Sequence, residues 1–157
     1  MATEALFDLS QVDLSHIEMD TEAIEAINPH RGHMRHLDSV IWISPGEHEA
    51  LGVKHVREDE FWVPGHIPGR PLLPGVLMIE AGAQLSAILY SNRAPKIRFI
   101  GFTRCDEVVF RSQVVPGDTL YLLSQEVNFG TRRFVARTQG IVNDKIAFEA
   151  KITGMAL

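Results

Sequence analysis

The sequence lacks the features that mark secreted or membrane-spanning proteins. Its 157 residues contain one cysteine, Cys105, which excludes an internal disulfide and fits a reducing compartment. No run of 18 or more apolar residues is present, so the sequence offers no candidate membrane-spanning helix. The first 27 residues are acidic and lack the basic and apolar regions of a signal peptide. These absences predict a cytoplasmic protein.

The composition indicates one globular domain. A chain of this length with 45% hydrophobic residues can form a sizeable core, and neither a repeat nor a low-complexity linker divides it. We expect residues 1–20 to form an extension and residues 21–157 a single domain. The net charge of −5 and the lack of a basic–aromatic motif argue against nucleic acid as a partner.

The order of the predicted elements favours an α+β fold. A short helix is expected over residues 21–27, two strands over 40–44 and 49–57, and a long apolar helix over 76–89. Five more strands are predicted over residues 96–103, 107–115, 120–128, 133–142 and 145–155. Turn residues separate the last four of these strands. Such an order predicts an antiparallel sheet that covers the helix.

Residues 61–90 place a histidine in a stiff loop and a carboxylate on an apolar helix 14 positions later. The loop around His66 cannot be a regular helix or a central strand, because it is rich in proline and glycine: Pro64, Gly65, Pro68, Gly69, Pro71, Pro74 and Gly75. A proline such as Pro74 is tolerated where a helix begins, since no N–H is needed there. The histidine and Glu80 together predict acid–base chemistry.

Glu80 and Gln84 interrupt the apolar helix and share one of its faces. Because an ionised carboxylate is costly in apolar surroundings, the pKa of Glu80 should rise unless a partner compensates. A raised pKa suits a proton donor. A lone glutamate on a core helix is more often a paired structural group, and it is the loop residue His66 that favours catalysis here.

The segment HIPGRPLLPGVLMIEAGAQ resembles the signature H-F-P-G-x-P-x-x-P-G-V-L-x-x-E-A-x-A-Q of the β-hydroxyacyl-acyl-carrier-protein dehydratases of FabZ and FabA type. Two other segments are similar to motifs of that family: Pro29-His30-Arg31 with Asp38, and VVPGD at residues 114–118. The similarity covers about residues 22–155. It implies a hotdog fold, in which an antiparallel sheet wraps around one long central helix.

The resemblance also implies an activity, namely the reversible dehydration of a (3R)-3-hydroxyacyl-[acyl-carrier-protein] to the trans-2-enoyl thioester in fatty acid biosynthesis. His66 would remove the C2 proton, and Glu80 would protonate the leaving C3 hydroxyl. Backbone N–H groups at Gly75 and Val76 would bind the thioester carbonyl, while Gln84 would orient the carboxyl or a water. No metal or organic cofactor is expected, because the reaction involves no redox change.

The partners implied by the resemblance are a carrier protein bearing an acyl-phosphopantetheine and a second copy of the chain. In that family the two catalytic groups of one site come from different subunits, so a homodimer is expected, or a trimer of dimers. Residues 81–157 hold ten Lys or Arg and six Asp or Glu, against five and 14 in residues 1–80. Arg104, Arg132 and Arg133 are candidate contacts for an acidic carrier. An ordinary solvated surface explains these arginines equally well.

The chain departs from the family pattern at four places. Residues 32–37, GHMRHL, replace an apolar segment, Ile67 replaces a phenylalanine, and Gly82 stands where methionine is common. The segment 101–110 is about three residues longer than usual. Because these positions lie near the expected substrate channel or dimer interface, the resemblance does not predict the acyl-chain preference.

Other functions stay open on the sequence alone. A thioesterase of the same fold would hydrolyse the thioester, another relative would also isomerise the double bond, and a non-catalytic subunit would only bind acyl groups. His30, His33 and His36 recur at every third position, but no further ligand completes a metal site. Cys105 lacks the partner expected of a catalytic nucleophile.

Overall fold

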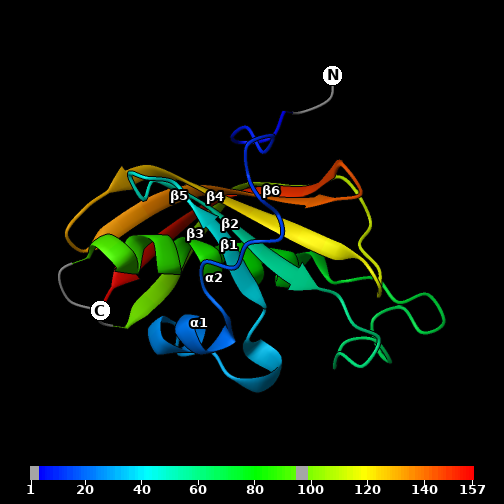
Figure 1. Cartoon of the computed structure of the whole chain (residues 1–157). Coiled ribbons are helices and arrows are strands. Elements are labelled where there is room, and N and C mark those ends of the chain that lie inside the picture. The colour runs from blue at the N-terminus through cyan, green and yellow to red at the C-terminus, as the bar shows by residue number, and fades with distance from the viewer. Residues whose placement is uncertain (1–3, 95–98) are drawn as a thin grey trace.

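A six-stranded antiparallel sheet curves around one long helix in the computed structural model, which describes residues 4–94 and 99–157 (Figure 1). Along the chain the elements are α1 (Thr21–Ile27), the 3-10 helix η1 (Gly32–Met34), β1 (Ser39–Ile43), β2 (Glu49–His55), α2 (Gly75–Arg93), β3 (Ile100–Phe110), β4 (Thr119–Phe129), β5 (Arg133–Val142) and β6 (Lys145–Ala156). The strand order is β1-β2-β4-β5-β6-β3. This arrangement is the hotdog fold and confirms the predicted α+β class.

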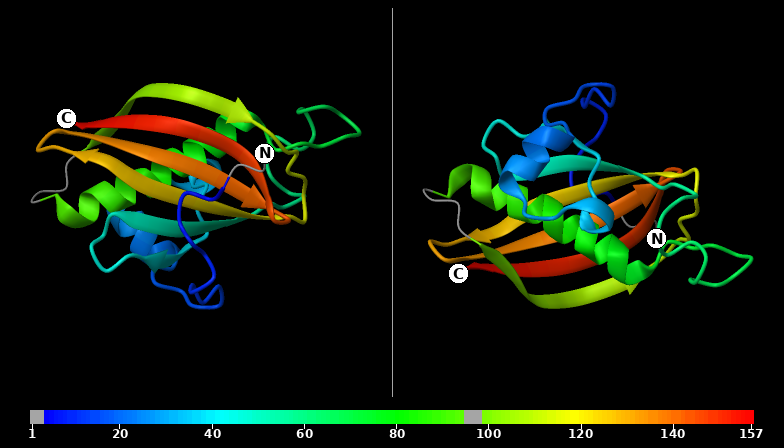
Figure 2. Two further views of the ribbon diagram at one scale, coloured as in Figure 1. Left: turned by 90° about the horizontal axis from the view of Figure 1, so that it is seen from above. Right: turned by 90° about the horizontal axis from the view of Figure 1, so that it is seen from below.

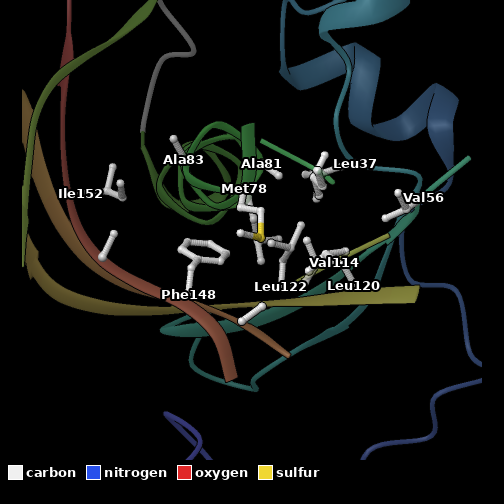
Figure 3. Close-up of a cluster of buried hydrophobic side chains, with 14 of the residues drawn as sticks. Leu37, Val56, Met78, Ala81, Ala83, Val114, Leu120, Leu122, Phe148 and Ile152 are labelled. Carbon is white, nitrogen blue, oxygen red and sulfur yellow. The ribbon is translucent and has the colours of Figure 1, made fainter. Parts of the chain in front are cut away.

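Helix α2 lies across one face of the sheet, with α1 beside it (Figure 2). It is buried on most sides because its sequence is apolar almost throughout. Figure 3 shows Leu122 and Phe148 of the sheet beside Met78 of the helix, while Ile152 lies on the side of Ala83. The helix runs four residues beyond the predicted end at residue 89, and the N–H of Ala94 caps it by donating to the carbonyl of Tyr90.

Two strands were predicted over residues 96–103 and 107–115. Residues 95–98 lie outside the described residues, and for the rest of the segment the prediction of two strands was wrong. One continuous strand, β3, pairs with β6. Its register shifts twice, between Phe102 and Arg104 and between Asp106 and Val109. Each shift is a bulge that places one extra residue opposite β6. The two bulges therefore take up two residues of the extra length of this segment.

The N-terminal residues cross the opposite face of the sheet from α2 (Figure 1). Apolar side chains from this segment pack on an outer cluster of the sheet: Leu6, Phe7, Leu9 and Val12 against Ile41, Trp42, Leu51, Tyr121 and Leu123. The N-cap of α1 is Asp20, whose carboxylate accepts from the N–H of Ala23. None of the described helices has the length and apolar character needed to span a bilayer.

Gly82 lies where α2 passes closest to β5. A Cβ at this position would fall 2.4 Å from Oγ1 of Thr138, which is much closer than real atoms approach. Thr138 is buried, and its hydroxyl donates to the carbonyl of Leu123 at 2.8 Å. The absence of a side chain at Gly82 therefore lets the helix pack directly against Thr138 of the sheet.

Candidate active site

His66 lies in the loop between β2 and α2, which projects beyond one end of the sheet (Figure 2). Its Nδ1 is 2.6 Å from the carbonyl oxygen of Leu72. Since a carbonyl can only accept, Nδ1 carries the proton and donates it, and the neutral ring presents Nε2 as a base. The N–H of His66 also donates to the carbonyl of Trp62 at 2.8 Å, which fixes the turn.

A buried ion pair anchors the start of this loop. Nζ of Lys54 on β2 lies 2.5 Å from Oε1 of Glu60, and the two side chains are only 3% and 8% exposed. The other carboxylate oxygen of Glu60 accepts from the N–H of Arg57. Because each charge is costly to bury alone, the pair holds the loop against the end of the sheet.

The N-terminus of α2 presents free backbone donors. Leu77 and Met78 donate to the carbonyl of Pro74, whereas the N–H groups of Gly75 and Val76 donate no hydrogen bond within the described residues. A Cβ on Gly75 would lie 2.5 Å from the half-exposed ring of Phe110, so the ring packs directly on the start of the helix. Two unpaired N–H groups at a helix start can bind a developing negative charge.

The Glu80 carboxyl is held by two side chains. Nε2 of Gln84 donates to Oε1 of Glu80 at 2.9 Å, and Nε2 of His30 lies 3.3 Å from the same oxygen. Gln84 in turn is fixed by the segment before β1, because its Nε2 also donates to the carbonyl of Met34 and its Oε1 accepts from the N–H of His36. The carboxyl therefore has one defined orientation.

The pKa of Glu80 is lowered from its ordinary value, in contrast to the expectation of a rise. The contact with His30 is the largest cause, and the hydrogen bond from Gln84 acts in the same direction. Burial raises the pKa but is outweighed. The expected rise applied only to a carboxylate without a compensating partner, and His30 and Gln84 are such partners.

A cavity of about 190 Å³ opens beside Glu80. It lies between α2 and the strands β3 and β6, and most of its wall is apolar: Pro29, Ala83, Ala87, Phe99, Ile100, Gly101, Phe102, Phe134, Ile152 and Gly154. The polar groups on its wall are His30, Glu80 and Gln84. An apolar cavity with a few convergent polar groups at one end is suited to a substrate with an alkyl chain and a reactive head.

The side chains of His30, His33 and His36 lie in different surroundings. His30 contacts Glu80, and the exposed His33 packs its ring 5.7 Å from that of Phe61. His36 is 2% exposed, and neither of its ring nitrogens has a partner among the described residues. In the described part of the chain no three His, Cys, Asp or Glu side chains form a group that could hold a metal ion.

His36 is held neutral by its surroundings. Burial lowers its pKa to about 4, and the positive charge of Lys54 adds to this effect. The charges of Glu80 and Glu60 raise the pKa of His36, whereas His30 lowers it. The imidazole of His36, which interacts electrostatically with Glu80, is thus uncharged at neutral pH.

The remaining candidates lie apart from the cavity. Nε of Arg104 is 2.7 Å from a carboxylate oxygen of Asp106, so its charge has a local partner. Arg132 and Arg133 form no ion pair among the described residues and flank the turn into β5. Desolvation raises the pKa of the Cys105 thiol, which disfavours the thiolate that a nucleophile requires.

The structure therefore brings together only part of the predicted site within one chain. Glu80 and Gln84 share the cavity, whereas His66 is not among its lining residues. Sequence reasoning missed the contact of His30 with Glu80. The Pro29-His30-Arg31 motif was the available signal, but the histidine was weighed only as a metal ligand.

Comparison with known proteins gives a consistent result. The sequence model of the FabA-like domain family matches residues 28–151. The chain is 36% identical over 135 residues to the 3-hydroxyacyl-[acyl-carrier-protein] dehydratase FabZ of Desulforamulus reducens, covering 85% of the chain and 94% of that protein. It is 38% identical over 137 residues to the bifunctional enzyme LpxC/FabZ of Porphyromonas gingivalis, of which it spans only 29%.

Among solved structures, the dehydratase heterocomplex ApeI:P from Xenorhabdus doucetiae is similar with a TM-score of 0.71. The match covers 85% of the chain and 90% of that structure at 15% sequence identity. At this identity the likeness concerns the fold alone. It agrees with the hotdog architecture described above.

Proposed function

The chain belongs to the family of FabA-like domains, and from this membership we propose that it dehydrates (3R)-3-hydroxyacyl-[acyl-carrier-protein] to the trans-2-enoyl thioester in fatty acid biosynthesis. The enzyme is a hydro-lyase of the 3-hydroxyacyl-[acyl-carrier-protein] dehydratase type. The observation that carries the proposal is the apolar cavity that has the Glu80 carboxyl, oriented by Gln84, on its wall.

The chemistry needs two proton transfers, because hydroxide is a poor leaving group and the C2 proton is only weakly acidic. Nε2 of His66 removes the C2 proton, and Glu80 protonates the hydroxyl that leaves C3. Each positioned transfer contributes roughly 10²–10⁴ in rate. The free N–H groups of Gly75 and Val76 bind the thioester oxygen while negative charge develops on it.

The low pKa of Glu80 sets a condition on this mechanism. A proton donor must be protonated, and the contact with His30 favours the carboxylate. An acyl chain that fills the cavity excludes water, and burial raises a carboxyl pKa. Substrate binding thus shifts Glu80 toward its acid form.

The proposal includes a homodimer. Within the chain, β3 is an edge strand that pairs only with β6, and apolar side chains on and beside it are exposed: Phe99, Phe102, Val108, Val109 and Phe110. An exposed apolar edge is suited to pairing with a second copy. A partner seated there would bring its own His66 loop toward the cavity, so each site would combine two subunits. A trimer of dimers remains a further prediction.

The acyl chain arrives on a carrier protein, whose phosphopantetheine arm carries the thioester. Arg132 and Arg133 are the proposed contacts for its acidic surface, with Arg104 third because Asp106 already neutralises it. We propose no metal or organic cofactor. A cytoplasmic location stays a prediction that the lone Cys105 supports.

The test is to follow the absorbance of the enoyl thioester formed from a hydroxyacyl carrier by the wild-type enzyme and by His66→Ala and Glu80→Gln. Both variants should lose at least about 10²-fold in kcat while keeping their melting temperature. Wild-type turnover in both variants would refute the assignment. Release of free thiol, measured in the same reaction, would instead identify a thioesterase.

A further inference from the structure

We propose that Phe134 forms the end wall of the cavity beside Glu80 and thereby limits the enzyme to acyl chains of short and medium length. The inference rests on the proposed function, because it takes the acyl chain of the substrate as the occupant of the cavity. It names the residue that sets the substrate class, which the family resemblance does not predict.

The depth of the cavity follows from the helix that lines it. Glu80, Ala83, Gln84 and Ala87 all lie on its wall, so the cavity follows one face of α2 from Glu80 to Ala87. Seven helical positions advance about 10 Å. An extended chain gains roughly 1.2 Å per single bond, as the polypeptide backbone does, so this depth holds about eight carbons beyond C3.

The volume is compatible with an alkyl chain. The cavity of about 190 Å³ is many times larger than the roughly 10–15 Å³ that one water molecule requires. The small side chains Ala83, Ala87, Gly101 and Gly154 make this space along the wall. The depth along α2 corresponds to an acyl chain of roughly eleven carbons in total.

The ring of Phe134 lines the cavity and contacts Tyr90, about one turn of α2 beyond Ala87, which places the ring at that end of the cavity. It stacks on Tyr90 with ring centroids 4.9 Å apart, and the Tyr90 hydroxyl donates to the carbonyls of Gly130 and Thr131, each at 3.0 Å. On the other side, a Cβ at Gly154 would fall 2.3 Å from the Phe134 ring. Glycine at this position is therefore required for the ring to lie across β6.

Space continues behind this ring. A small void of about 10 Å³ is lined by Phe134 itself together with Ser86, Leu89, Tyr90, Glu126 and Ala136. Phe134 thus lines both the cavity and the void and separates them. Truncating its ring should join the two spaces, whereas filling the cavity at Ala87 should shorten it.

The experiment measures kcat/KM of the full-length enzyme with 3-hydroxyacyl carriers of 4 to about 16 carbons. In the wild type, kcat/KM should rise with chain length by up to about fourfold per added methylene and then fall beyond about ten carbons. Phe134→Ala, or the milder Phe134→Leu, should move this optimum to longer chains. Ala87→Leu should move it to shorter chains.

Phe129→Ala is the matched control. Phe129 contacts the same Tyr90 ring, at 5.0 Å, but is not among the residues that line the cavity. Its chain-length profile should match that of the wild type. Melting temperatures identify any variant that fails to fold, and Ala87→Leu tests the inference without removing an aromatic ring.

Opposite shifts of the optimum in the Phe134 and Ala87 variants support the inference. Active variants that both keep the wild-type profile overturn it and leave the proposed dehydratase function intact. A wild-type enzyme that dehydrates no chain length overturns the proposed function, and this inference with it.

Discussion

Nε2 of Gln84 donates to Oε1 of Glu80 at 2.9 Å, one helical turn away. The same amide group contacts the carbonyl of Met34 and the N–H of His36, so the segment before β1 positions the carboxyl through α2. Residues that are about 50 positions apart in the sequence therefore act on one oxygen atom. Several consequences of this arrangement can be measured.

His30 controls the protonation of Glu80. Its contact lowers the pKa of the carboxyl, and an acid catalyst is active only below its pKa. His30→Phe should therefore raise the pKa of Glu80 and move the alkaline limb of the pH profile of kcat/KM to higher pH. Gln84→Leu should shift it in the same direction by less. An alkaline limb that stays in place in both variants would contradict this role of His30.

His36 makes the fold sensitive to acid. Burial lowers its pKa from 6.5 to about 4, so the unfolded chain takes up a proton that the folded protein does not. The free energy of unfolding should therefore fall by roughly 3 kcal/mol as the pH decreases from about 6.5 to about 4. Urea unfolding at several pH values measures this loss.

The variant His36→Leu should be more stable than the wild type at pH 5 and should lose much less stability over that range. Leucine also removes two buried ring nitrogens that have no partner, each a cost of about 1–3 kcal/mol. His33→Leu serves as the control, because His33 is exposed. Equal acid sensitivity of His36→Leu and wild type would show that another group is responsible.

The pair of Lys54 and Glu60 should behave as a unit. Lys54→Met leaves the buried carboxylate of Glu60 without its partner and should lower the free energy of unfolding, measured with urea, by about 3–5 kcal/mol. Glu60→Gln removes the negative charge that compensates the buried ammonium group of Lys54. The double variant Lys54→Met, Glu60→Gln should recover a large part of that loss. Additive losses in the double variant would argue against the pairing.

Gly82→Ala should destabilise the protein although alanine is the better helix former. The intrinsic helix preference favours alanine by about 1 kcal/mol, but the added methyl group would meet Thr138. Overpacking of this kind costs about 1–3 kcal/mol. In a Thr138→Ala background, which lacks both the hydroxyl and the methyl group that the new side chain would meet, Gly82→Ala should lower the melting temperature less. A stabilised Gly82→Ala single variant would contradict the close approach.

Much of the fold could be predicted from the sequence because the signals were local. Apolar residues on every face marked α2, and turn residues such as Asn143 and Asp144 separated the last strands. β3 was divided wrongly between residues 103 and 107, where the paired strand continues through bulges. A bulge depends on the neighbouring strand, which local patterns do not contain.

The site was predictable in its residue types but not in its contacts. His66 and Glu80 stand out by their surroundings in the sequence, and Gln84 follows from helical spacing. The contact between His30 and Glu80 and the burial of His36 depend on how the segment before β1 folds back onto α2. Its direction is set by tertiary packing, so the sequence alone could not supply it.

The central claim is that each site combines His66 of one subunit with Glu80 of the other. The direct test is to unfold and refold an equal mixture of His66→Ala and Glu80→Gln chains and to measure dehydratase activity. In the mixed dimers one of the two sites is intact, so about one quarter of the wild-type activity should return. Activity no higher than that of either variant alone, with mixed dimers shown to be present, would contradict the account.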